Sequence, residues 1–197
     1  EEAEVAMQAI TQANNELASI MEANPDILYV FNLNGELIKW NANFEKFCGL
    51  THQQMKHRQM TEFICKKDRE IVLKGISETF ARGASSIEAH FIRHDGEFIP
   101  FLCNCVVLKN VSGDVIAFTG TGRDITERKK AEESMQLASM VYQNSSEAIM
   151  VTDADNTIIA VNPAFERTTG YIVDEVIGKN PRILASGLHD KYFYQAM

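Results

Sequence analysis

The four thiols of this sequence are its most reactive side chains, and their spacing limits what they could do. The cysteines are Cys48, Cys65, Cys103 and Cys105. No two of them form a Cys-x-x-Cys pair, the usual unit of a structural zinc site, so we expect no metal centre. Cys103 and Cys105 lie two apart in a predicted strand and point to one face, roughly 6–7 Å apart, which is unfavourable for a disulfide. We expect four reduced thiols, as is typical of a cytosolic protein.

Other residue patterns that support catalysis do not occur in this sequence. It has no G-x-x-x-x-G-K-[ST] loop, no His-Glu-x-x-His and no G-x-S-x-G. Gly120-Thr121-Gly122 is a lone G-x-G inside a predicted strand with no helix glycine after it, which makes a poor dinucleotide fingerprint. We therefore expect this chain to have no catalytic residues and not to be an enzyme.

The composition narrows the range of partners. The 197 residues carry 27 acidic and 19 basic side chains, a formal net charge of −8. A nucleic-acid binder or an anionic-membrane binder would need a positive field instead. No apolar run approaches the ~18–20 residues that span a bilayer, and the acidic start Glu1-Glu2-Ala3-Glu4 does not resemble a signal peptide. We expect a cytoplasmic location, no nucleic-acid partner and no membrane segment.

An internal repeat with an offset of 121 positions organises the chain. Residues 28–41 align with residues 149–162 without gaps, and the match continues in the same register. The identical pairs are Val30/Val151, Ile38/Ile159, Asn41/Asn162, Phe44/Phe165, Glu45/Glu166 and Gly49/Gly170. A repeat of this length predicts two copies of a domain and not a short-period solenoid.

Local patterns in the first copy predict two short strands, then helices, then three longer strands. Hairpin turns are expected at Asn34-Gly35 and Asp95-Gly96, and the two helical patterns stop at Gly49 and Gly83. The predicted helices cover residues 42–48 and 68–82, and the last three strands cover residues 85–94, 97–108 and 115–123. This order predicts an α+β fold, with an antiparallel sheet and the helices on one side.

The second copy is predicted to be incomplete. Met197 aligns with Ile76, so the last three strands have no counterpart and the natural protein is expected to continue. Two strands alone are marginal as a sheet, so this half-domain should be mobile, swapped or bound to another chain.

Two amphipathic segments precede the two copies. Their apolar positions are Ala6, Ile10, Ala13, Leu17 and Ile20 in the first, and Ala131, Met135, Ala138 and Tyr142 in the second. Spacings of three and four are typical of helices that pair in a coiled-coil-like homodimer. The alternative is that each stripe packs on its own domain, and both interpretations stay open.

Three segments resemble the PAS family. Val161-Asn-Pro-Ala-Phe-Glu-Arg-Thr-Thr-Gly-Tyr171 is similar to its first half, and Arg93-His-Asp-Gly-Glu-Phe-Ile-Pro100 to its central hairpin. Gly122-Arg-Asp-Ile-Thr-Glu-Arg128 resembles the Asp-Ile-Thr signature of the closing PAC motif. The resemblance implies a five-stranded PAS fold curved around a pocket, usually dimeric, which passes signals along helices to a kinase or a cyclic-dinucleotide enzyme.

The resemblance and the repeat together predict the organisation of the chain. We expect an N-terminal helix (1–21), a complete PAS domain (22–126), a linker helix (127–143) and the first half of a second PAS domain (144–197). The expected function is that of a sensory or regulatory module in two-component or cyclic-di-GMP signalling. It would bind a small ligand or relay a signal to an output domain elsewhere. The alternatives are a ligand-free dimerisation scaffold and a flavin-based redox sensor.

Cofactor binding is limited by the residues present. Haem-binding members of the family commonly use a His on the long helix, and residues 68–82 contain none, while His90 and His94 are expected at the hydrated surface. Gly178-Lys-Asn-Pro-Arg-Ile-Leu184 resembles the G-x-N-C-R-F-L motif of light-sensing LOV domains. Pro181 stands where the photoactive cysteine would be, which excludes LOV photochemistry. FAD stays open for a full-length second domain, haem is disfavoured, and we expect no cofactor in this chain.

The pocket implied for the first copy has candidate lining residues but no named ligand. They are Phe31, Phe44, Phe47, Phe63, Ile76, Phe91, Leu102, Asn104 and Phe118. The alternative is that these side chains fill the core themselves. Asn104 stands out because a buried, unpaired amide costs about 1–3 kcal/mol, so a ligand, the backbone or solvent would have to pair with it.

The end of the last strand predicts a signal relay. Asp124 would accept a hydrogen bond at the start of the next helix, Thr126 would bond within the same turn, and Ile125 would pack against the domain. Together these residues would fix the angle at which the helix leaves the sheet. The alternative is a plain helix cap that transmits nothing.

Overall fold

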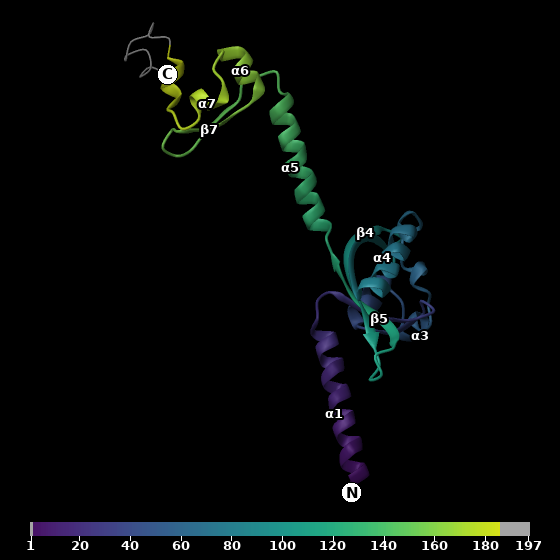
Figure 1. Cartoon of the computed structure of the whole chain (residues 1–197). Helices are drawn as coiled ribbons and strands as arrows, with labels where there is room; N and C mark the ends of the chain where they lie inside the picture. The colour runs from purple at the N-terminus through teal and green to yellow at the C-terminus, as the bar shows by residue number, and fades with distance from the viewer. Residues whose placement is uncertain (1, 186–197) are drawn as a thin grey trace. The chain divides into compact units, whose positions relative to one another are not determined.

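The computed structural model describes residues 2–185. The chain forms two compact units, one up to Lys129 and one from Lys130, and the boundary falls inside helix α5 (Thr126–Asn144) (Figure 1). Within the described residues, no helix combines the length and apolarity needed to cross a membrane. The same residues contain no group of three or more His, Cys, Asp or Glu side chains that could hold a metal ion.

The first unit is built on a five-stranded antiparallel sheet, which confirms the predicted fold class. The strands are β1 (Ile27–Asn32), β2 (Leu37–Trp40), β3 (Ala84–Ile92), β4 (Phe98–Lys109) and β5 (Val115–Asp124). Their order across the sheet is β2-β1-β5-β4-β3, so the first and last strands of the domain pair in the middle. The predicted ends of the last three strands lie within two residues of these.

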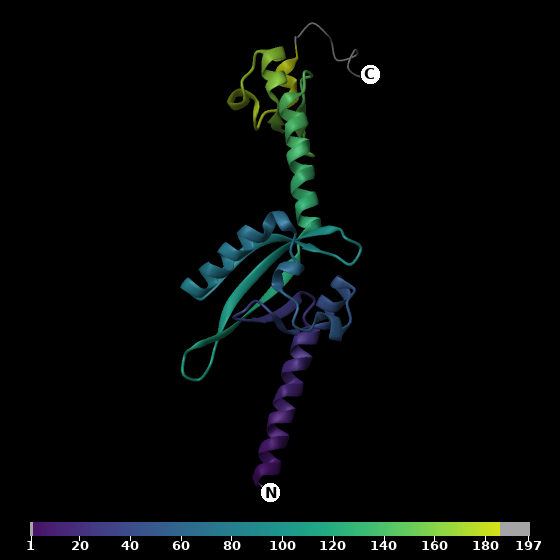
Figure 2. The same cartoon turned by 90° about the vertical axis from the view of Figure 1, so that its right-hand side faces the viewer.

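Helices connect β2 to β3. They are α2 (Ala42–Cys48), α3 (His52–Met55), the 3₁₀ turns η1 (Met60–Glu62) and η2 (Lys66–Asp68), and α4 (Arg69–Arg82). The predicted helix 42–48 matches α2, and α4 begins one residue after the predicted start. Helix α2 ends because Gly49 takes the left-handed conformation, with φ of 62°, and its N–H bonds back to Glu45. Figure 2 shows α4 running alongside the sheet.

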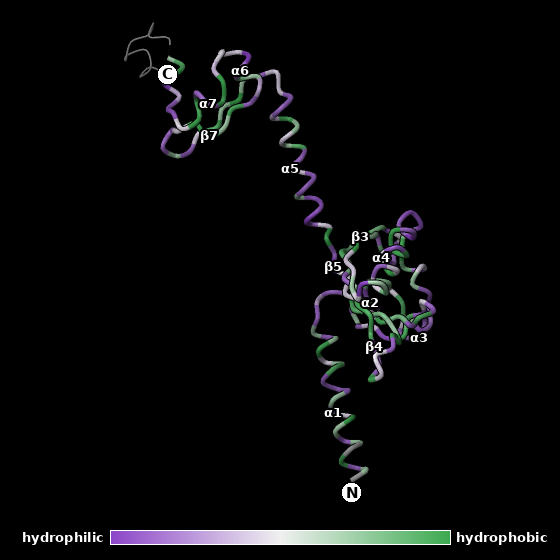
Figure 3. Tube along the Cα trace, in the orientation of Figure 1, coloured by the Kyte–Doolittle hydropathy of each residue, from purple (hydrophilic) through white to green (hydrophobic). Residues whose placement is uncertain are grey.

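The N-terminal helix α1 (Glu2–Ala23) projects away from this sheet in both views (Figures 1 and 2). Hydrophobic and hydrophilic residues alternate along its trace (Figure 3). Ile10, Leu17 and Ile20 of the predicted stripe are 59%, 60% and 68% exposed. The stripe therefore does not pack on its own domain here. The side chain of Ala6, also predicted in the stripe, lies outside the described residues.

The second unit repeats the first half of the first. Its elements are β6 (Met150–Thr152), β7 (Ile158–Val161), α6 (Pro163–Thr169), α7 (Val173–Val176) and η3 (Pro181–Leu184). Gly170 ends α6 with φ of 80°, as Gly49 ends α2. The backbone N–H of Ile158 bonds to Lys179, and that of Leu37 bonds to Arg58 at the equivalent positions. The repeat therefore extends to individual backbone contacts.

Candidate signal-transfer site and domain core

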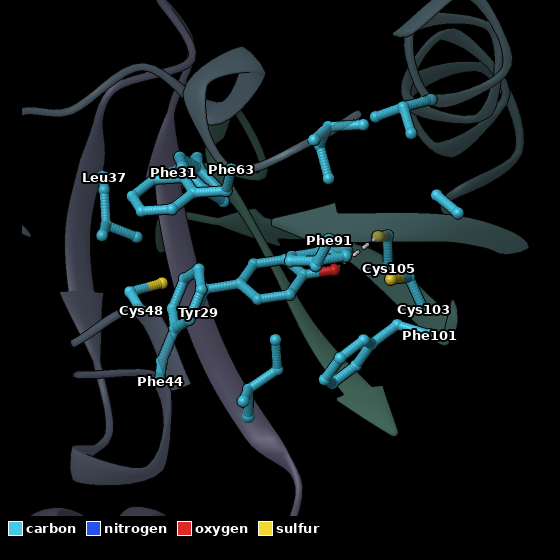
Figure 4. Close-up of a cluster of buried hydrophobic side chains, with 14 of the residues drawn as sticks. Tyr29, Phe31, Leu37, Phe44, Cys48, Phe63, Phe91, Phe101, Cys103 and Cys105 are labelled. Carbon is cyan, nitrogen blue, oxygen red and sulfur yellow. Dashed lines mark hydrogen bonds between the residues drawn. The ribbon is translucent and has the colours of Figure 1, made fainter. Parts of the chain in front are cut away.

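The core of the first unit is filled mainly by aromatic side chains. Phe31, Phe44, Phe63, Phe91 and Phe118 are all at most 5% exposed. Their rings contact one another, as in Phe31–Phe118 with ring centres 5.5 Å apart and Phe44–Phe63 with ring centres 4.9 Å apart. Figure 4 shows part of this cluster. Side chains from the sheet and from the helices thus meet in one apolar layer.

A small cavity of ≈ 20 Å³ remains inside this core. Of the predicted lining residues, Phe31, Phe63, Ile76, Phe91 and Phe118 border it. The other two predicted aromatic residues, Phe44 and Phe47, pack within or against the same core without bordering the cavity. A space of this size holds about one water molecule. Drug-sized ligands occupy pockets of about 300–1,000 Å³, so such a ligand would require these rings to move.

Leu102 and Asn104 lie on the opposite face of the sheet from the cavity, which differs from the prediction. Side chains alternate along a strand, and Cys103 and Cys105 of β4 are buried on the core side. Leu102 is therefore half-buried and Asn104 exposed on the outer face. The exposed amide needs no buried partner. The sequence did not reveal which face of β4 is buried, because the outer face also carries apolar residues.

The polar atoms near the cavity come from residues that the sequence did not single out for it. The Tyr29 hydroxyl lies 3.3 Å from the Cys105 sulfur, and Cys103 borders the same space (Figure 4). Burial raises the pKa of Cys103 to about 12 and raises the pKa of Tyr29 well above its usual value. Both groups are therefore protonated at neutral pH, and Cys103 is a poor nucleophile.

Gly120 has a packing role in β5. A Cβ at this position would lie 2.7 Å from the Tyr29 hydroxyl oxygen and 2.7 Å from the Asn104 carbonyl oxygen. Any larger residue would displace Tyr29, so close packing explains why glycine stands here.

His90 was predicted to lie at the hydrated surface, but it is half-buried and contacts the segment that leads into α4. Its backbone N–H and its ring Nδ1 both lie 2.7 Å from one carboxylate oxygen of Asp68, just before α4. Burial alone would raise the pKa of Asp68, but the bonds from His90 and the nearby charge of Lys67 lower it below its usual value. The contact fixes the start of α4 to β3. His94 is exposed.

The three residues predicted for the relay lie where β5 becomes α5. The Asp124 carboxylate accepts the backbone N–H of Thr126 at 2.8 Å. Ile125 is 5% exposed, and its N–H donates to the carbonyl of Pro100 in β4 at 3.0 Å. The Thr126 hydroxyl is buried without a hydrogen-bond partner, so the predicted local bond is absent from this turn. The first helical bond runs instead from the Lys129 N–H to the Ile125 carbonyl.

Glu88 of β3 is a further anchor of α5 that the sequence did not reveal. Its carboxylate forms ion pairs with Arg128 and with Lys129, the latter at 2.7 Å. Hydrogen bonds from Lys129 and Arg128 lower the pKa of Glu88 below its usual value. No local pattern signals the contact, because the partners lie 40 and more residues apart in sequence.

Strand β3 contacts a different helix on each face. On the core face, Ile87 lies so close to Gly75 of α4 that a Cβ there would be 2.6 Å away, and the Ser85 hydroxyl lies 2.6 Å from Thr79 of α4. On the outer face, the next residue, Glu88, holds α5. One strand therefore contacts both α4 and α5.

Comparison with known families matches both units. Residues 25–127 match the model described as PAS domain, and residues 137–197 match the model described as PAS fold. Among solved structures, the PAS domain of a Colwellia psychrerythraea protein is 23% identical with a TM-score of 0.55, covering 59% of this chain and 99% of that one. An RNA-binding Light-Oxygen-Voltage receptor is 21% identical with a TM-score of 0.56, covering 64% and 37%. Both likenesses show the fold alone.

Curated relatives are longer proteins. A nitrogen fixation regulatory protein of Klebsiella oxytoca is 46% identical over 57 residues, which cover 29% of this chain and 12% of the relative. The aerobic respiration control sensor protein ArcB of Escherichia coli is 25% identical over 129 residues, covering 65% and 17%. The peroxide stress-activated histidine kinase mak1 of Schizosaccharomyces pombe is 23% identical over 154 residues, covering 73% and 9%. The chain thus spans less than a fifth of these relatives.

Proposed function

Because the chain belongs to the PAS family, we propose that it is a sensory module that relays a signal from its first domain along α5 towards the second domain and an output beyond it. The relatives that are sensor or regulatory proteins support a signalling role. The observation that carries the proposal is the attachment of α5 to three strands: β5 leads into it, Pro100 of β4 bonds Ile125, and Glu88 of β3 pairs with Lys129.

The packed core favours relay over the binding of a large ligand in the first domain. Its cavity of ≈ 20 Å³ lies among side chains that already contact one another. A signal in this domain would therefore act by shifting α4 or the sheet. The FAD alternative for the second domain rests on Gly178-Lys179-Asn180, and the visible absorbance of purified protein tests it.

A homodimer is part of the proposal. Most helical stability in proteins comes from the packing of an amphipathic face, and the apolar stripe of the 22-residue helix α1 is exposed. The exposed stripe of α1 has the spacing of a coiled-coil seam, and a second copy would supply a matching surface. We also propose a cytoplasmic location and an output of the kinase or cyclic-dinucleotide type outside this chain.

Substitution Asp124→Ala tests the relay. Loss of a cap should cost only ~0.5–2 kcal/mol of stability, while the response of the output in a full-length protein that carries this chain should change. The matched control is Asn110→Ala, in the loop that precedes β5. The Asn110 side chain likewise accepts backbone N–H groups in a turn, those of Ser112 and Asp114. If Asp124→Ala responds to the signal as the control does, Asp124 is only a cap and the relay is wrong.

A further inference from the structure

Asn41 and Asn162 are fully buried polar residues at equivalent positions of the repeat, each with no exposed surface. The Asn41 side-chain oxygen accepts the N–H groups of Leu28 and Phe44, at 3.0 and 3.3 Å. The Asn162 oxygen accepts those of Ile149 and Phe165, at 2.8 and 3.0 Å. Each oxygen thus joins the start of the domain to the first turn of a helix, α2 or α6.

The side-chain nitrogens reach the helix that enters each domain. Asn41 Nδ2 donates to the carbonyl of Met21, in the last turn of α1, at 3.3 Å, and to that of Asp26 at 2.9 Å. Asn162 Nδ2 donates to the carbonyl of Tyr142, in the last turn of α5, at 3.2 Å, and to Glu147 at 2.9 Å. The last carbonyls of a helix have no partner within it, so these donors satisfy groups that would otherwise need solvent.

An asparagine is needed for this arrangement, but not for capping alone. Ser and Asp cap helices about as well as Asn does. Only an amide side chain offers both an acceptor oxygen and two N–H donors from one planar group. The donors directed at Met21 and Tyr142 are therefore the part of the contact that attaches the incoming helix.

The two domains differ in how many other groups share this attachment. In the first domain, the Glu22 carboxylate accepts the N–H of Ala42 at 2.9 Å, and Asn43 donates to the carbonyl of Asn24 at 2.8 Å. In the second domain, Pro163 replaces Ala42 and has no N–H, and Ala164 replaces Asn43 and has no side-chain donor. Both accessory bonds are chemically impossible there.

We propose that Asn162 is the positioning residue at which α5 is coupled to the second PAS domain. Among residues 2–185, the hydrogen bonds of this coupling form a single-point joint, unlike the attachment of α1, which Glu22 and Asn43 reinforce. The inference rests on the proposed relay, since α5 is the helix that leaves the first domain at Asp124. A movement of α5 would reach helix α6 and Ile149, the residue before strand β6, through the Asn162 amide, which bonds to all three.

Hydrogen exchange of the backbone amides in the whole chain tests the joint. Asn162→Asp keeps the acceptor oxygen but removes both donors. It should reduce protection in the last turn of α5 by about tenfold, because the bond to Tyr142 is lost there and the bond to Glu147 is lost just after the helix. Asn41→Asp is the matched control and should change the last turn of α1 less, because the Glu22 and Asn43 bonds remain. Equal effects in the two helices would overturn the single-point joint.

The coupling itself is tested by adding Asp124→Ala. In the otherwise unchanged chain, this substitution should alter exchange in β6 and α6, and with Asn162→Asp that effect should disappear. If Asp124→Ala never reaches the second unit, the proposed relay fails. If it reaches the second unit equally with and without Asn162→Asp, the relay stands and the role of Asn162 is wrong.

A second set of variants is needed if Asn162→Asp unfolds the second unit. It replaces the Asn162 bonds with those that Glu22 forms in the first domain. The neutral Asn162→Ser retains a capping oxygen but lacks the two amide N–H donors. Adding Gln143→Glu and Pro163→Ala places a carboxylate and an N–H where Glu22 and Ala42 stand in the first domain. The rebuilt chain should regain protection in the last turn of α5, and failure to regain it would contradict the proposed attachment.

Discussion

Glu88 and Lys129 form an ion pair of 2.7 Å that joins an edge strand of the first PAS domain to the first turn of its exit helix. Both side chains are about two-fifths exposed, at 41% and 40%, so solvent screens the pair and its contribution to stability is small. The main effect of the ion pair is on position, because it attaches α5 to β3 in addition to β4 and β5.

Substitution Glu88→Gln removes the negative charge that Arg128 and Lys129 share. We expect a loss of at most ~1 kcal/mol of stability, as for exposed pairs, together with faster exchange of the first-turn amides of α5. Denaturant unfolding and hydrogen exchange measure the two effects. Glu97→Gln, which removes an exposed pair with Arg93 on the β3–β4 hairpin, is the control and should leave α5 unchanged. A stability loss without any change in α5 would contradict the anchoring role.

The sequence predicted those parts of this structure that depend on neighbouring residues. Gly49 and Gly83 stop helices by their own backbone chemistry, so α2 and α4 were placed to within one residue. Glu88 and Lys129 meet only after β3, β4 and β5 have paired, so no local pattern could reveal the contact.

The assignment of the β4 side chains to the two faces of the sheet was only partly correct. Cys103 and Cys105 were correctly predicted to share one face, yet Asn104 between them was taken as a core residue because both of its flanks are apolar. Strict alternation places Leu102 and Asn104 together on the outer face. Asn104 is the polar residue of this pair, and its polarity could have indicated that the face it shares with Leu102 is the exposed one.

The two faces of the sheet should respond differently to truncation. Phe91→Ala removes a buried ring that contacts Phe44 and Phe101, and should cost about 3–5 kcal/mol. Asn104→Ala on the exposed outer face should change stability by no more than ~0.5 kcal/mol. Urea unfolding of both variants and the unmodified chain measures the difference. A comparable loss for Asn104→Ala would mean that its amide has a buried partner.

Acid should weaken the attachment of α4 to β3. The pKa of Asp68 is lower in the folded chain than its usual value, so its contribution is fully present above the unfolded pKa and is lost as the pH falls through the folded pKa. We expect Asp68→Asn to lower the free energy of unfolding near neutral pH. Between about pH 5 and pH 2, the free energy of unfolding of this variant should fall less steeply than that of the unmodified chain. Unfolding midpoints across this range measure the effect, and an unchanged acid slope would show that the Asp68–His90 contact contributes nothing.

The four cysteines should be reduced and unreactive in the folded protein. All four are buried, and burial raises the pKa values of Cys48 and Cys103 to about 12, so almost no thiolate forms at neutral pH. A thiol reagent should modify the native chain slowly, and it should find four free thiols after denaturation without a reductant. Two free thiols would indicate a disulfide, contrary to the geometry expected for Cys103 and Cys105.

The exposed stripe of α1 predicts how the proposed dimer could be broken. Leu17 is 60% exposed and lies between Ala13 and Ile20 in the three-and-four spacing of a coiled-coil seam. Leu17→Glu would bring like charges together in a homodimer and should shift sedimentation towards the monomer. Because the seam lies outside the packed core, the unfolding of the PAS domain should change little.

Gln12→Glu adds the same charge away from the stripe and should leave the association unchanged. If the unsubstituted chain sediments as a monomer at all concentrations, or if Leu17→Glu associates as before, α1 does not mediate dimerisation.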